Sequence, residues 1–206
     1  MSEESSIKVI LVGKSGSGKT NIINALVDKP FEDQNDSTLT SSFVSKNVII
    51  NKKKYQLEIW DTAGQEMYKS LTRLFVVDSR IVIFVYDITD DGSFLELDYW
   101  ITTVKEILGK TPIYAIFGNK EDLYLNEKVS EEDGKKKADE NGCLFRLTSA
   151  KTERENINSY LNELVNEYIA KKLKNNEPLP QREESFALQY NIQNNKKKKK
   201  CCDKLN

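Results

Sequence analysis

Short apolar runs with the length of strands alternate along this chain with segments whose apolar residues recur at helical spacing. The run from Ile81 to Tyr86 lacks polar alternation, as is typical of a central parallel strand that is covered on both faces. Strands are predicted from such runs at residues 7–12, 43–50, 55–60, 81–86, 113–117 and 143–147. The polar residues 51–54 separate two of these runs by a short turn, which predicts an antiparallel hairpin.

Helical spacing follows the first strand at residues 22–26 and returns at residues 94–108 and 157–168. Gly109 directly follows the second of these segments and is expected to end its helix. Because strands and helices alternate, we predict an α/β fold, a three-layer sandwich in which a six-stranded, mostly parallel sheet carries helices on both faces. In such folds the ligand-binding loops lie at the carboxyl ends of the strands.

The periodic pattern stops near Lys174. Residues 175–195 are rich in Asn, Gln and Glu and contain Pro178 and Pro180, which is typical of a flexible linker. With 206 residues the chain is long enough for one α/β domain and a tail. We therefore predict a folded domain over residues 1–173 and a flexible tail over residues 174–206.

The composition excludes several classes of protein. The longest unbroken apolar run is far shorter than the ~20 residues of a membrane span, and the acidic start of the chain does not resemble a signal peptide. The absence of histidine excludes a histidine base or a histidine-bound metal, but a hard cation with oxygen ligands remains available. Cys143 is isolated and Cys201 and Cys202 are adjacent, so the cysteines form no disulfide framework and favour a reducing, cytosolic compartment.

Charge is divided unequally along the chain. Residues 1–170 carry 21 Lys and Arg against 28 Asp and Glu, whereas residues 171–206 carry 10 against 4. An acidic body with a basic tail predicts that the tail seeks an anionic surface, either a nucleic acid or a layer of lipid headgroups.

The residues after the first strand carry the strongest chemical signal. Residues 13–20, Gly-Lys-Ser-Gly-Ser-Gly-Lys-Thr, match the phosphate-binding loop pattern between a strand and a helix. Its glycines allow successive backbone N–H groups to point at phosphate oxygens. Lys19 is expected to reach the β- and γ-phosphates, and the Thr20 hydroxyl to bind Mg²⁺. The predicted phosphate-binding residues are Ser15, Gly16, Ser17, Gly18, Lys19 and Thr20.

A second motif, Asp-Thr-Ala-Gly-Gln-Glu, begins at Asp61 at the end of a predicted strand. We expect Asp61 to hold Mg²⁺ through a water molecule, and the N–H of Gly64 to meet the γ-phosphate. Gln65 is placed to orient a water molecule for in-line attack. Gln65 and Lys19 are therefore the predicted catalytic residues.

Two later motifs, Asn-Lys-Glu-Asp and Thr-Ser-Ala-Lys, favour guanine as the base. The carboxylate of Asp122 can accept two N–H bonds from guanine, and adenine lacks both donors. A backbone N–H near Ala150 can donate to O6 of guanine. Each motif is weak alone, but their order and their places at strand ends together predict a guanine-nucleotide site. The predicted base-binding residues are Asn119, Lys120, Asp122, Ser149, Ala150 and Lys151.

On these motifs the chain resembles a small GTPase of the Ras superfamily, most closely of the Rab branch, over about residues 6–173. Residues 55–60, 67–72 and 84–89 also match Rab patterns. The resemblance implies a GTP-binding G domain that hydrolyses GTP to GDP and phosphate, with Mg²⁺ as cofactor. It also implies a switch in vesicle-mediated membrane traffic whose partners are a GTPase-activating protein, a guanine-nucleotide exchange factor and effectors.

The resemblance assigns further residues to the site. Thr38 is expected to close over Mg²⁺ and the γ-phosphate; Thr40 is a rival metal ligand, but the spacing favours Thr38. Phe31 is expected to pack against the guanine. Phe43, Trp60 and Phe75 match a surface aromatic triad that responds to the bound nucleotide. Ordinary packing is the alternative explanation for each of these aromatic residues.

The chain departs from the Rab pattern in two places, which bear on the identity of effectors and exchange factors but leave the nucleotide site alone. Residues 38–43 lack the glycine and the acid of many Rab proteins, and Ser41 and Ser42 favour the early-endosomal branch. Residues 74–79 also differ from the usual sequence. Since no arginine precedes Arg73, the phosphate-binding loop supplies none, which predicts slow hydrolysis that an activating protein accelerates.

The tail ends in Lys196–Lys200 followed by Cys201 and Cys202. With a Rab-like body we expect these cysteines to carry lipid and the lysines to face anionic headgroups. The pair resembles the doubly geranylgeranylated ending of Rab proteins, which implies prenyl-escort partners, but four residues follow it and modification of one or of both stays open. The expected location is the cytosolic face of intracellular vesicle or endosomal membranes, with a cytosolic pool.

Two other functions compete with this interpretation. A degenerate GTPase that holds nucleotide with little turnover is favoured by the altered residues 39–42, but Thr20 and Gln65 argue against it. A nucleic-acid binder that uses the lysine run is disfavoured by the acidic body. We therefore expect no nucleic-acid partner.

Overall fold

The computed structural model describes residues 6–31, 42–61 and 72–178 of the chain. The strands in these residues are β1 (Ser6–Val12), β2 (Ser42–Ile50), β3 (Lys53–Asp61), β4 (Ile81–Asp87), β5 (Ile113–Asn119) and β6 (Leu144–Thr148). The helices are α1 (Lys19–Leu26), α2 (Thr72–Val76), α3 (Asp91–Leu108), the 3₁₀ helix η2 (Glu121–Asn126), α4 (Glu131–Glu140) and α5 (Arg154–Lys174).

The strands form one sheet in the order β2-β3-β1-β4-β5-β6. Only β2 runs antiparallel to its neighbour, and each other adjacent pair in the sheet is parallel. Most side chains of β1 and all side chains of β4 are buried, on both faces of the sheet, as the unbroken apolar runs predict. The predicted six-stranded, mostly parallel sheet is therefore confirmed.

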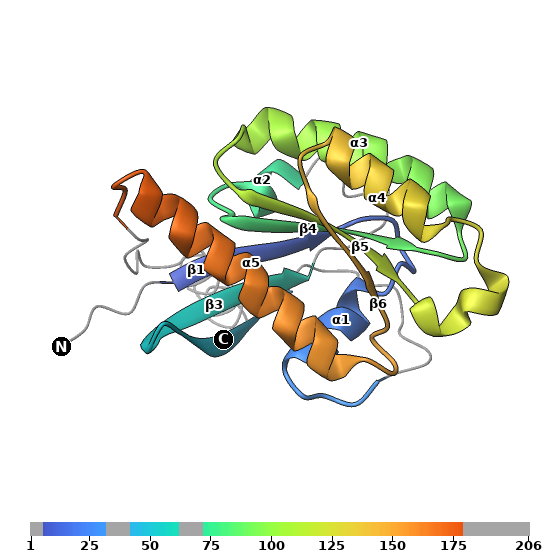
Figure 1. Cartoon of the computed structure of the whole chain (residues 1–206), viewed down its shortest axis with the longest axis horizontal. Helices are drawn as coiled ribbons and strands as arrows, with labels where there is room; N and C mark the ends of the chain where they lie inside the picture. The colour runs from blue at the N-terminus through green and yellow to red at the C-terminus, as the bar shows by residue number, and fades with distance from the viewer. Residues whose placement is uncertain (1–5, 32–41, 62–71, 179–206) are drawn as a thin grey trace, which may run out of the picture.

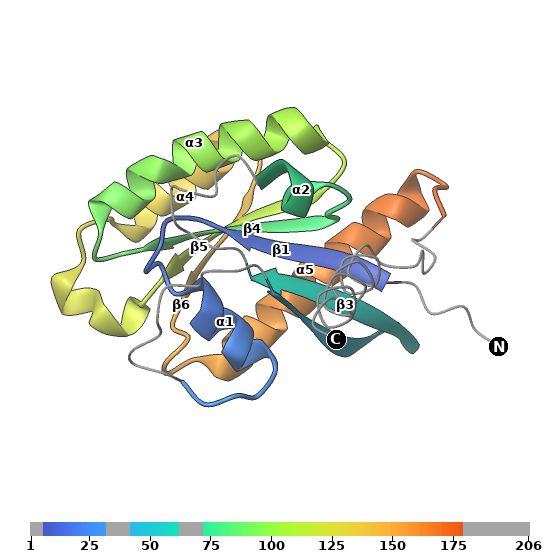
Figure 2. The ribbon, with the colours of Figure 1, turned by 180° about the vertical axis from the view of Figure 1, so that it is seen from behind.

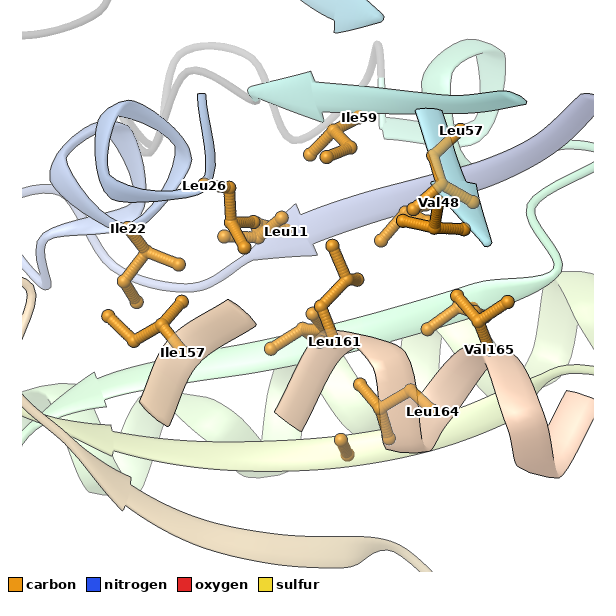
Figure 3. Packing of buried hydrophobic residues seen from close by; sticks show 14 of the residues in the cluster. Leu11, Ile22, Leu26, Val48, Leu57, Ile59, Ile157, Leu161, Leu164 and Val165 are labelled. Carbon is orange, nitrogen blue, oxygen red and sulfur yellow. The ribbon is translucent and has the colours of Figure 1, made fainter. Parts of the chain in front are cut away.

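Successive strand residues point to opposite faces of the sheet, and each face is covered by its own helices. α1 and α5 pack on one face, where Leu11, Ile22 and Leu161 belong to one buried cluster (Figure 3). α2, α3 and α4 pack on the other, where Trp100 and Ala138 belong to a second cluster. Figures 1 and 2 show these two helix layers on either side of the sheet, so the predicted three-layer sandwich is confirmed.

The hairpin is tighter than the sequence suggests. The predicted turn spans residues 51–54, whereas β3 already begins at Lys53 and only Asn51 and Lys52 make the turn. Both turn residues have positive φ, 50° and 64°. This geometry suits the twist of paired strands, and it allows Lys53 and Lys54 to extend the ladder despite their polarity.

Apolar spacing does not predict some of the helices, and it predicts others shorter than they are. α4 is missed because it buries only Gly134 and Ala138; its start is instead marked by Ser130, whose hydroxyl accepts a bond from the N–H of Asp133 at 3.1 Å. The five-residue α2 and the 3₁₀ helix η2 are also missed, being too short to show a period. α5 is longer than predicted and ends at Lys174, where the periodic pattern stops.

α3 begins at Asp91 and ends before Gly109, whose φ of 67° stops the helix where the sequence predicts. β6 begins one residue later than predicted, so Cys143 lies just before the strand, buried and free. Among the described helices, none combines the length and the apolar character needed to cross a bilayer.

Candidate nucleotide-binding site

The loop between β1 and α1 approaches its neighbours so closely that it requires glycine. A Cβ atom on Gly13 would lie 2.1 Å from the backbone oxygen of Val85, and one on Gly18 would lie 2.2 Å from Nδ2 of Asn119. Gly13, Gly16 and Gly18 also have positive φ. The backbone of residues 13–18 is therefore free to curl between β1 and the start of α1, as a phosphate-binding loop does.

Lys19 lies inside this curl with only 5% of its surface exposed. Its ammonium donates hydrogen bonds to the backbone oxygens of Gly13 at 2.7 Å and Lys14 at 2.9 Å. Burial lowers the pKa of Lys19 to about 8, and the nearby carboxylate of Asp61 opposes this shift. A buried ammonium at the positive end of α1 is a site for a multiply charged anion.

Thr20 and Asp61 meet across the start of α1 and the end of β3. The Thr20 hydroxyl donates to the Asp61 carboxylate at 2.8 Å, and Asp61 is 5% exposed. Hydroxyl and carboxylate oxygens are hard donors of the kind that Mg²⁺ prefers. These two residues therefore fit a magnesium ion beside the phosphate-binding loop.

Asn119, at the end of β5, ties the phosphate-binding loop to the loop after β6. Its side-chain amide donates to the backbone oxygen of Ser17 at 2.9 Å. Its side-chain oxygen accepts from the N–H of Ala150 at 3.3 Å and from the hydroxyl of Thr148 at 3.4 Å. The residue is 2% exposed, so these are buried hydrogen bonds that fix the two loops relative to each other.

The predicted base-binding residues also meet in space. The hydroxyl of Ser149 donates to the Asp122 carboxylate at 2.5 Å and accepts from the N–H of Thr152 at 3.1 Å. The ammonium of Lys151 lies 5.4 Å from the ring centroid of Phe31. The loops after α1, β5 and β6 thus bring Asp122, Lys151 and Phe31 to the carboxyl edge of the sheet.

Lys120 adopts a left-handed conformation, with φ of 70°, directly after β5. Its ammonium pairs with the Asp87 carboxylate at 2.6 Å. Asp87 is 6% exposed and also accepts from the N–H and the hydroxyl of Thr89. The end of β4 therefore holds Lys120 in place beside the base-binding loop.

The structure thus brings residues 15–20, Asp61 and the base-binding residues to one edge. The predicted Thr38, Gly64 and Gln65 lie outside the described residues, as do Cys201 and Cys202. A model of the Ras family matches residues 8–170 of this chain.

The chain belongs to the Ras family of small GTPases.

Three curated relatives carry names from this family. The chain is 39% identical over 175 residues to Ras-related protein Rab-2B of Dictyostelium discoideum, a match that covers 85% of this chain and 86% of the relative. It is 42% identical over 144 residues to Ras-related protein Rab-21 of Geodia cydonium, covering 70% and 63%. It is 36% identical over 171 residues to Ras-related protein RHN1 of Nicotiana plumbaginifolia, covering 83% and 82%. These relatives support a Rab GTPase, and the members of the family are GTP hydrolases.

The aromatic residues that the Rab resemblance singles out are in contact. The ring centroids of Phe43 and Trp60 lie 5.0 Å apart, and those of Trp60 and Phe75 lie 6.4 Å apart. The ammonium of Lys8 lies 4.9 Å from the Trp60 ring and donates to the backbone oxygen of Val77 at 2.8 Å. Burial lowers the pKa of Lys8 to about 8.

Two ion pairs of this GTPase site were not predicted from the sequence. One joins Lys120 to Asp87, and the other joins Lys14 of the phosphate-binding loop to Asp90 before α3 at 2.8 Å. Asp87 could have been identified from the sequence as a partner of Lys120, because it ends β4 beside the predicted end of β5. Lys14 carries no such signal, since its position in the loop pattern accepts any residue.

Replacement of Asn119 by alanine tests the tether, that is, the hydrogen bonds by which Asn119 joins Ser17 to Ala150. Asn119→Ala leaves the buried Ser17 oxygen and Ala150 N–H without this partner, and we expect the free energy of unfolding to fall by about 2–4 kcal/mol. Nucleotide affinity should fall with it. Asn126→Ala, at the exposed end of η2, is the control and should change the free energy by less than about 0.5 kcal/mol. Urea unfolding measures both; equal midpoints for Asn119→Ala and the unchanged protein would contradict the tether.

Proposed function

We propose that this Rab GTPase binds GTP and GDP with Mg²⁺, hydrolyses GTP slowly and serves as a molecular switch in vesicle-mediated membrane traffic. The observation that carries the proposal is the meeting of Lys19, Thr20 and Asp61 with the base-binding residues around one buried tether, Asn119. A phosphate-binding loop alone selects neither base nor reaction. The tether joins it to the residues that select guanine.

Base selection rests on Asp122, whose carboxylate is held by the hydroxyl of Ser149. In the proposed complex the carboxylate accepts two N–H bonds from guanine, and a backbone N–H near Ala150 faces O6. Phe31 and Lys151 pack beside the ring. Adenine would leave the Asp122 carboxylate without these donors, so this arrangement discriminates strongly against ATP.

The phosphate groups bind to the loop over residues 13–18 and to Lys19, whose buried ammonium neutralises their charge. Thr20, Asp61 and Thr38 would hold Mg²⁺, which neutralises charge on the phosphates when bound. The N–H of Gly64 meets the γ-phosphate in this proposal.

Hydrolysis depends on position and charge rather than on covalent chemistry of the protein. Gln65 orients the attacking water, and Lys19 stabilises the charge on the phosphoryl oxygens. No arginine precedes Arg73, so the phosphate-binding loop supplies no arginine of its own. We therefore expect slow GTP hydrolysis. An activating protein that supplies an arginine can raise the rate by a factor of ~10³–10⁵. Loss of the γ-phosphate frees Thr38 and Gly64, and the partner-binding surface changes.

A second candidate function is a protein that holds nucleotide with little turnover. It is favoured by residues 39–42, which depart from the usual Rab sequence beside Thr38. The rate of hydrolysis separates this candidate from the switch.

Replacement of Asp122 by asparagine tests the base assignment. An amide cannot accept both guanine N–H bonds, so Asp122→Asn should lower GDP affinity by at least about a hundredfold and raise affinity for xanthosine diphosphate. Asp139→Asn, on exposed α4, is the charge-matched control and should leave both affinities unchanged. Fluorescence titration measures them, and an Asp122→Asn protein that still prefers GDP would refute the assignment.

Replacement of Gln65 by leucine tests the catalytic role. We expect single-turnover release of phosphate from bound GTP to slow by at least about tenfold, because the water loses its orienting group, while GTP affinity is retained. Gln56→Leu on β3, far from the carboxyl edge, should hydrolyse normally. An unchanged rate in Gln65→Leu rejects the role, and no turnover in the unchanged protein selects the nucleotide-holding candidate.

The tail would keep this switch on the cytosolic face of intracellular vesicle or endosomal membranes, with a cytosolic pool. Two lipid chains on Cys201 and Cys202, or one chain with the lysine run, give stable anchoring, whereas one chain alone gives marginal binding. Prenyl-escort proteins are the expected partners for that modification.

Loss of both terminal cysteines tests the anchor. In a eukaryotic cell Cys201→Ser/Cys202→Ser should move the protein from the membrane fraction to the cytosol and abolish the lipid mass on the C-terminal peptide. Cys143→Ala is the control, because this buried thiol is free in the structure and should not affect the membrane fraction. Mass spectrometry that finds two free thiols on the membrane-bound protein would overturn the anchor.

A further inference from the structure

The edge of the sheet opposite the nucleotide site is strongly basic. It is formed by the amino ends of β1, β3, β4 and β5, the β2–β3 turn and the end of α5, that is, by residues 6–8, 51–54, 77–80, 108–113 and 168–178. These residues contain nine Lys and Arg against two Asp and Glu. The remaining described residues contain 14 Lys and Arg against 21 Asp and Glu, so the folded domain has a basic end and an acidic remainder. We call this end the basic face.

The basic face is built on rigid elements. The ammonium of Lys171 on α5 donates to the backbone oxygens of Lys110 at 2.8 Å and Thr111 at 3.0 Å, which ties α5 to the segment before β5. The hairpin packs on α5 through the buried cluster that contains Val48 and Val165 (Figure 3). In Figures 1 and 2 the β2–β3 turn and the end of α5 lie at the same end of the molecule, opposite the loop between β1 and α1.

Its charges face solvent together with apolar side chains. Lys52, Lys110 and Lys174 are exposed, one on each of three separate segments of the face. Ile49 beside the turn is 76% exposed, and Leu173 near the end of α5 is 61% exposed. Cations around exposed aliphatic side chains suit a surface that presents anions above an apolar layer.

We propose that the basic face lies against an anionic lipid bilayer and orients the GTPase domain on it. Charge complementarity supports this occupant, and so does the course of the chain. α5 ends at this face, and the segment that follows carries Lys196–Lys200, which favour the same anionic surface. The acidic remainder of the domain is repelled by such a surface, so a bilayer selects this one orientation.

The orientation has a functional consequence. The nucleotide site lies at the other edge of the sheet, so it faces away from the bilayer together with Lys14 and Asp122. Exchange factors and activating proteins then reach it from the aqueous side. This inference deepens the proposed function and rests on its membrane location, but the basic face includes neither the predicted nucleotide-binding residues nor the terminal cysteines.

Vesicle binding by the full, unlipidated chain loaded with GDP and Mg²⁺ tests the proposal. The vesicles contain either phosphatidylcholine alone or equal parts of phosphatidylcholine and phosphatidylserine. The variant Lys52→Glu/Lys110→Glu/Lys174→Glu reverses one charge on each segment of the face. The control Lys128→Glu/Lys135→Glu/Lys136→Glu makes the same change in net charge at exposed positions near and on α4.

We expect the variant of the basic face to bind the phosphatidylserine vesicles at least about tenfold more weakly than the unchanged chain, because each lysine near an anionic leaflet strengthens binding several-fold. The affinity of the α4 control for these vesicles should fall by less than about threefold. Since this control has the same tail and the same net charge as the variant of the basic face, the difference between the two reports the position of the charges. Equal losses in the two variants would mean that net charge alone decides, and would overturn the proposal. So would binding to phosphatidylcholine alone that matches binding to the mixed vesicles.

Two further readouts complete the test. Hydrogen exchange on the mixed vesicles should slow in residues 50–54 and 109–112 and stay unchanged in residues 120–128; the reverse pattern would contradict the orientation. Tighter binding of the unchanged chain to a single-stranded RNA than to the vesicles at the same salt would overturn the proposal in favour of nucleic acid. GDP affinity and GTP hydrolysis of the same proteins are measured separately, so a failure of the proposed GTPase function is distinguished from a failure of the lipid face.

Discussion

The nucleotide site depends on the buried hydrogen bonds of one side chain, Asn119. Three loops that follow β1, β5 and β6 would otherwise be free to move independently at the edge of the sheet. The Asn119 amide holds Ser17 on one side and Ala150 on the other, and Gly18 leaves the room for it that a Cβ atom would fill. In the proposed function, phosphate binding and base selection are coupled through this residue, which need not touch the phosphates.

The parallel sheet gives the molecule two ends with opposite chemistry. The carboxyl ends of the strands present the loops to which we assign the nucleotide, with Lys19 and Asp61 buried among them and Thr20 bonded to Asp61. The amino ends of the strands and the end of α5 present exposed lysines at the surface. One topological rule therefore separates the site that we assign to the nucleotide from the surface that we assign to lipid.

Much of the fold follows from the sequence because the central strands are apolar without interruption. The apolar run over residues 81–86 is typical of a strand covered on both faces and lies within β4, and Gly109 ends α3 as expected. α4 could not be found in this way, because it buries only two small residues and is stabilised by its cap at Ser130 and by packing on its neighbours. Tertiary contacts, which apolar periodicity does not report, decide such elements.

The site could be predicted where its chemistry follows local motifs. The residues predicted to bind phosphate and base lie at one edge of the sheet, as their places at strand ends predict. The pair of Lys14 with Asp90 could not be predicted in the same way, because it joins residues that are distant in sequence and Lys14 carries no motif signal. The pair of Lys120 with Asp87 could have been found from the neighbouring ends of β4 and β5, although the two residues are also distant in sequence.

Calorimetry on nucleotide-stripped protein in the presence of Mg²⁺ tests the proposed guanine-nucleotide site most directly. GDP should bind one molecule per chain with measurable heat, and ADP at the same concentration should give none above dilution. Removal of Mg²⁺ should weaken the GDP signal. No heat with GDP, or equal heats with GDP and ADP, would contradict the claim that this edge of the sheet selects a guanine nucleotide.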